Sequence, residues 1–181
     1  LMYRTAQPLP AQKGPSYMEA IRDVVKTYND GGFLIKVIDC DNGFRPIGGE
    51  LEREFHLKCN YSNPSEHEPH SERNNRVIKE RIRATFHGLP FNKLPRILIK
   101  ILVMESAKKL NFFPPRGGIS KVYSPRMILH QENLDFAKHC AYPFGTYIQA
   151  DNDTSPKNSM HPRTLDCIYL RYSDTPQGGH E

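Results

Sequence analysis

The sequence predicts an α/β domain followed by a small β-module, and three observations favour this class. Short apolar runs alternate with helical patterns up to about residue 60, and two longer helical patterns follow. Beyond residue 140, a polar loop rich in Asn, Asp, Ser and Pro separates two runs of aromatic and β-branched residues. The chain has 181 residues, of which 38% are hydrophobic, so it is long enough to bury a core in such a domain.

The first part of the chain predicts a helix between two strand segments. Residues 3–7 are expected to end a strand. Ser16 and Glu19 have the spacing of a capping box, so we expect a helix from Ser16 to the glycine-containing stop at 29–32. The apolar run 33–38 predicts a largely buried strand. The apolar face of the helix is expected to contain Met18, Ile21, Val25 and Tyr28.

The middle of the chain predicts three helices and one strand. A short acidic helix is expected near 50–54 and a strand over 55–61. Two clear helices follow over 72–86 and 94–110, the second with Pro95 in its first turn, where the missing N–H costs little. The core face of the second helix is expected to contain Leu94, Ile97, Leu98, Ile101 and Leu102.

The last third predicts a short helix over 125–131 and two strands, over 144–149 and 165–172. The four cysteines show no CxxC spacing, so we expect free thiols, mostly in the core, rather than a disulfide scaffold or a zinc ribbon. No run approaches the roughly 20 apolar residues of a membrane span, and residues 1–10 match neither a signal peptide nor a lipidation motif. We therefore expect an intracellular protein without a membrane partner.

Positive charge is concentrated in one segment of the chain. The formal net charge is +5, whereas residues 72–116 alone hold eleven basic residues against three acids. Such a segment favours a polyanionic partner, although a solvated helix face is the commoner explanation of a charge run. The basic residues are Arg73, Arg76, Lys79, Arg81, Arg83, Lys93, Arg96, Lys100, Lys108, Lys109 and Arg116.

Two acids suggest metal chemistry. Asp41 follows a predicted strand, and Glu72 begins the basic helix 31 positions later. Carboxylates of this kind hold hard divalent cations, and ions held in this way align the oxygens of a phosphoryl transfer. From the residues alone a purely structural role is favoured, because Asp41 suits a turn cap and Glu72 suits the positive end of a helix dipole.

Helical spacing places Arg76, Lys79 and Arg83 in one narrow stripe with Glu72. One helix face would then carry a metal ligand and three cations for phosphates. Pairs of Glu72 with Arg76 and of Glu80 with Arg83 would instead be ordinary surface ion pairs.

Three stretches of the chain together resemble one family. They read VIDCDNGF over 37–44, EHEPHSERNNRVIKERIRATF over 66–86 and RTLDCIYLRYSDTPQGGHE over 163–181. With the long apolar helix between them, they resemble the integrase region of Ty1/copia-type retrotransposon polyproteins. The Asp-Asn-Gly after a strand and the Glu-Arg-x-Asn-Arg that opens a helix are the two family signatures present.

The resemblance implies a partial RNase H-like integrase core over 1–115, a connecting helix and loops over 116–139, and a partial SH3-like β-module over 140–181. It implies a D,D,E site that uses Mg²⁺ or Mn²⁺ to join retroelement DNA to target DNA in the nucleus. By position, Asp41 is the second acid and Glu72 the third, while Asn75, Arg76 and Lys79 face DNA. The first acid is expected upstream of the chain, so we expect a polyprotein fragment without catalytic activity of its own.

The residues leave two questions open. Asp39, Glu66 or Glu68 stands close enough in sequence to replace an assigned acid. The chain is either an integrase fragment, a non-catalytic module that binds nucleic acid through Arg76, Lys79 and Arg83, or an inert retroelement relic. Missing strands would leave an open sheet edge, so self-association is also expected.

Overall fold

The computed structural model describes residues 1–62, 69–152, 160–173 and 179–181. The predicted α/β class is confirmed, since helices are combined with two small two-stranded sheets. None of the helices in these ranges combines the length and apolar character needed to cross a bilayer. In chain order the elements are α1 (Gly14–Asp30), β1 (Val37–Cys40), the 3-10 helix η1 (Asn42–Phe44), α2 (Arg45–Phe55), β2 (Lys58–Tyr61), α3 (Pro69–His87), α4 (Arg96–Lys109), α5 (Pro125–His130), α6 (Phe136–His139), β3 (Tyr147–Asp151) and β4 (Thr164–Ile168).

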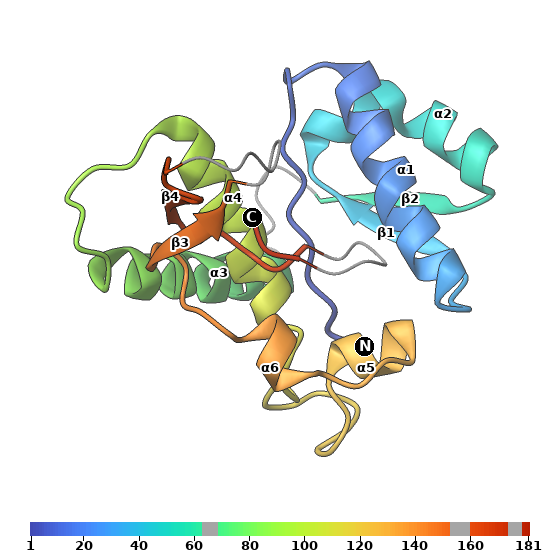
Figure 1. Ribbon diagram of the computed structural model, residues 1–181. Helices are drawn as coiled ribbons and strands as arrows, with labels where there is room; N and C mark the ends of the chain where they lie inside the picture. Colours follow the sequence, from blue (N-terminus) through green and yellow to red (C-terminus); the bar gives the residue numbers. More distant parts are fainter. Residues whose placement is uncertain (63–68, 153–159, 174–178) are drawn as a thin grey trace.

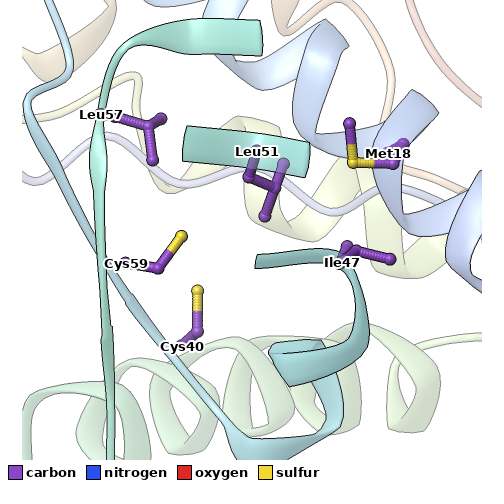
Figure 2. Close-up of a cluster of buried hydrophobic side chains, with 6 residues drawn as sticks. All are labelled: Met18, Cys40, Ile47, Leu51, Leu57 and Cys59. Atoms are coloured by element: carbon purple, nitrogen blue, oxygen red, sulfur yellow. The ribbon is translucent and has the colours of Figure 1, made fainter. Parts of the chain in front are cut away.

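The first sheet pairs β1 and β2 in parallel, with Val37 opposite Lys58 and Cys40 opposite Tyr61. Helices α1 and α2 lie together with this sheet in one half of the molecule, and α3 and α4 lie in the other (Figure 1). Figure 2 shows the side chains that form the core of the first half, contributed by both helices and both strands. They are Met18, Cys40, Ile47, Leu51, Leu57 and Cys59.

The predicted buried strand over 33–38 is wrong in position and in burial. The strand begins at Val37, which is 49% exposed, and Leu34 before it is 73% exposed. Pairing with β2 sets this position, because the Lys36 carbonyl accepts from the Lys58 N–H at 2.8 Å. Side chains alternate between the two faces of a strand. Cys40 therefore points into the core, whereas Val37 and Asp39 lie on the face that points away from it.

Two expectations near the N-terminus are also wrong. Residues 3–7 form no strand, because the backbone of Arg4 bonds to the side chain of Asn111 instead of a neighbouring strand. Helix α1 begins at Gly14, two residues before the expected capping box, and its N-cap Lys13 makes no side-chain cap bond. Pro15 in its first turn fits this earlier start, since a first-turn proline forfeits no helical hydrogen bond.

The helix α2 starts five residues before the expected acidic segment and follows directly on η1. Gly48 lies on its buried side, and a Cβ there would collide with the hydroxyl of Tyr61. This close approach holds α2 against β2. The guanidinium of Arg45 lies over the same Tyr61 ring, 5.4 Å from the ring centroid.

The two predicted central helices are present as α3 and α4, and they pack on each other. The expected core face of α4 is only partly right. Leu102 is 2% exposed, whereas Ile97 is 61% exposed. Burial instead continues through Glu105 and Ala107, because the C-terminal half of α4 is the part that other segments cover.

The second sheet is an antiparallel hairpin, with Tyr147 opposite Ile168 and Asp151 opposite Thr164. Its anchor is Tyr169, which is fully buried and accepts from the Gly145 N–H at 2.8 Å through its carbonyl. Burial raises the pKa of the Tyr169 hydroxyl to about 12. The predicted short helix is α5, which begins after its cap Ser124.

All four cysteines are free, as expected, and two of them are in the core. The sulfur atoms of Cys40 and Cys59 lie near each other on the core side of neighbouring strands (Figure 2). Burial, followed by the proximity of Cys59, raises the pKa of Cys40 to about 11. The Cys40 thiol therefore stays protonated at neutral pH and acts as a small apolar core residue.

Candidate nucleic-acid interface

Helix α3 gathers five of the six predicted site residues on one exposed face. We call these residues the α3 stripe. Together with Glu80 they line an open hollow of about 390 Å³. The residues of the stripe are Glu72, Asn75, Arg76, Lys79 and Arg83, and all of them are exposed.

The charges of the α3 stripe are mixed. Arg76 donates to the Glu80 carboxylate at 2.8 Å, and this hydrogen bond raises the pKa of the guanidinium. Glu80 therefore pairs with Arg76, and the expected pair with Arg83 does not form. Lys79 and Arg83 make no salt bridge with any residue in the described ranges. These two cations are the ones left available for a phosphate.

Asp41, the sixth predicted residue, lies outside the hollow and caps the helix η1. Its Oδ1 accepts from the Asn42 N–H at 2.7 Å. This is the turn-cap role that the sequence left open. Asp41 nevertheless lies at the carboxyl end of β1, and β2 runs parallel to β1 with Tyr61 opposite Cys40. The carboxyl end of β2, after which the chain continues to α3, therefore lies at the same end of the sheet as Asp41.

The described acids do not by themselves form a metal centre. Within the four described ranges, no three His, Cys, Asp or Glu side chains gather as they would around one ion. Asp39 accepts from the Asn60 side-chain amide at 3.1 Å. Glu66 and Glu68, which could also replace an assigned acid, lie outside the described residues. A divalent ion on Asp41 and Glu72 stays a prediction.

The opposite side of α3 lines a larger concavity, which we call the basic groove. It has a volume of about 1110 Å³. Its walls are α3, the end of α4, the N-terminal segment and the loop that follows α4. The basic residues among its lining are Arg4, Arg73, Arg81, Lys109 and Arg116.

One polar cluster holds the walls of the basic groove together. Asn111 is 2% exposed, accepts from the Arg4 N–H at 2.8 Å and donates to the Arg4 carbonyl at 2.7 Å. The Arg4 guanidinium in turn donates to Asn74 of α3 at 2.6 Å, and burial lowers its pKa. The N-terminal segment is thus tied to α3 and to the segment that follows α4, and it runs between the two halves of the molecule (Figure 1).

Sequence reasoning assigned no site role to Arg4, Asn111 or Phe113, three of the residues that build or line the groove. Arg73, Arg81 and Arg116 were visible only as members of the basic segment. No family model matches the chain, and no curated protein matches it. The function is therefore argued from the geometry of α3 and its surroundings.

Proposed function

We propose that this chain binds the phosphate backbone of DNA through the α3 stripe, as part of an integrase core of the Ty1/copia type. The observation that carries the proposal is the hollow that Asn75, Lys79 and Arg83 line together on one exposed helix face. Lysine and arginine side chains on such a face bind phosphates without reading the base sequence. Binding of this kind is electrostatic and weakens as salt increases.

The same proposal includes an RNase H-like core and an SH3-like module in this chain. A parallel strand pair that precedes two packed helices is consistent with part of an RNase H-like core over 1–115. The antiparallel hairpin is consistent with part of an SH3-like module over 140–181, after the connecting segment 116–139. The intact parent would join DNA in the nucleus with Mg²⁺ or Mn²⁺, with Asp41 and Glu72 among the ligands.

The proposal is tested with a fluorescently labelled duplex and the full chain over a series of salt concentrations. The variant replaces Arg76, Lys79 and Arg83 with alanine. Each phosphate contact contributes a slope of about −0.9 to log K against log salt on duplex DNA. Because Glu80 already pairs with Arg76, we expect the slope to flatten by about two rather than three contacts.

The matched control replaces Lys13, Lys36 and Lys58 with alanine. These lysines are exposed and lie in the other half of the molecule, and their substitution removes the same total charge as the stripe variant. If both variants weaken binding equally, net charge alone accounts for the affinity and the stripe has no special role. Wild-type affinity in the stripe variant likewise contradicts the proposal.

A second series with Mn²⁺ tests the integrase component. If Asp41 and Glu72 share an ion, Mn²⁺ should strengthen duplex binding by the wild type and leave the Asp41→Asn variant unchanged. Asp41→Asn keeps an oxygen that can cap η1 and removes the charge, so it separates the ligand role from the cap role. An equal Mn²⁺ response in both proteins would contradict a metal role for Asp41.

A further inference from the structure

The lining of the basic groove contains cations but no carboxylate among the described residues. Lys109 is paired with Glu105 at 3.4 Å, and Arg4 is bonded to the neutral side chain of Asn74. Arg73, Arg81 and Arg116 are exposed and make no salt bridge within the described ranges. Like charges without counter-charges repel one another, so the groove is complementary to a ligand with several negative charges.

The spacing of the cations fits a ligand with repeated charges. Arg73 and Arg81 are separated by eight positions of α3, a rise of roughly 12 Å along the helix. Arg116 projects from the loop that forms another wall. A single anion occupies one of these positions, whereas a chain of phosphates can occupy several.

The groove also presents apolar surface. Phe113 is 51% exposed although it lies within the groove, and Val77 and Leu110 contribute further apolar lining. The Phe113 ring makes a tilted contact with Phe136 at a centroid distance of 5.9 Å. In proteins that bind single strands, bases stack on exposed aromatic rings that lie beside cations without a salt bridge. Phe113 and its neighbouring arginines have this arrangement.

Two other polyanions fit these surroundings less well. A duplex offers its phosphates but keeps its bases stacked inside, so the apolar lining would gain no partner. An acidic peptide offers carboxylates, but it lacks a planar ring at every repeat of the chain, as a nucleic acid strand has. Only a single strand supplies phosphates and exposed bases along the same chain.

We infer that the basic groove binds a single-stranded stretch of nucleic acid, with phosphates on Arg73, Arg81 and Arg116 and a base stacked on Phe113. This inference rests on the proposed function, because it assumes that nucleic acid is the partner of the chain. It assigns single and double strands to opposite sides of one helix.

The test compares a labelled oligothymidylate with a labelled duplex of equal length, using the full chain. Phe113→Ala should weaken single-strand binding by roughly fivefold or more, the lower end of the stacking contribution, and leave duplex binding unchanged. Tyr123→Ala is the matched control, because Tyr123 is 52% exposed and does not line the groove. Replacing Arg73 and Arg81 with alanine should flatten the single-strand salt slope by about 1.4, at about 0.7 for each phosphate.

The two proposals can fail separately. Single-strand binding that is insensitive to Phe113→Ala and to the two arginine substitutions overturns the groove inference, whatever the duplex does. Duplex binding that is insensitive to the stripe variant overturns the proposed function, whatever the single strand does. Competition by polyglutamate at the same charge concentration as well as by oligothymidylate would reassign the groove to an acidic protein and also overturn the inference.

Discussion

The two sides of α3 both carry cations, but their surroundings differ. In the hollow of the α3 stripe, Glu72 and Glu80 lie among the cations, and Arg76 is held in an ion pair with Glu80. In the basic groove, the described lining has no acid, and an exposed aromatic ring adds an apolar surface. The stripe lies on one helix, whereas the groove is lined by four segments of the chain. The number of cations alone therefore does not define a ligand, because neighbouring acids and rings decide what can bind.

Charge reversal in the groove is expected to have the largest effect. Arg73→Glu combined with Arg81→Glu should lower single-strand affinity by about a hundredfold or more, because charged hydrogen bonds contribute about 1.5–3 kcal/mol each and the reversal adds repulsion. The measurement is fluorescence anisotropy at one fixed salt concentration. Duplex affinity should fall much less. Equal losses for both ligands would show that the two sides of α3 are not distinct.

Asn111→Ala tests whether the groove is built by its polar cluster. The substitution leaves the part-buried N–H and carbonyl of Arg4 without their partner, at a cost of about 1–3 kcal/mol in the free energy of unfolding. Chemical denaturation measures this cost. Asn133→Ala, at an exposed position, is the control and should be neutral. A neutral Asn111→Ala would mean that the N-terminal segment does not form a wall of the groove.

Duplex binding through the stripe should be sensitive to Glu80, the acid beside it. Glu80→Gln removes the partner of Arg76, so a third cation becomes available to phosphates. We expect duplex affinity to rise a few-fold, in line with the ~0.2–1 kcal/mol of an exposed ion pair. Glu19→Gln on α1 changes the net charge equally and should have a smaller effect. An unchanged affinity for Glu80→Gln would indicate that Arg76 does not face the duplex.

The stripe could be predicted from sequence because helical spacing is local. Residues three and four positions apart share a face in any α-helix, and α3 forms over nearly the expected range. The same reasoning failed for the strand near residue 35. Its position is set by pairing with Lys58 and not by its own apolar run.

The groove could not be predicted because its walls meet only in the folded chain. Arg4 and Asn111 are separated by 107 positions, and no local sequence pattern predicts the hydrogen bonds that join them. The exposed Phe113 looked like any apolar residue after a helix. Asp41 shows the converse, since the sequence offered two roles and the structure displays the cap while the metal role stays a prediction.

Simultaneous binding of both ligands tests whether the two sides of α3 hold different forms of nucleic acid. Labelled oligothymidylate is first bound to the full chain, and unlabelled duplex of unrelated sequence is then added to saturation. We predict that the anisotropy of the labelled strand stays high or rises, because a ternary complex forms. Displacement of the single strand by the duplex would show that both ligands share one surface, and the two sides of α3 would then not be distinct sites.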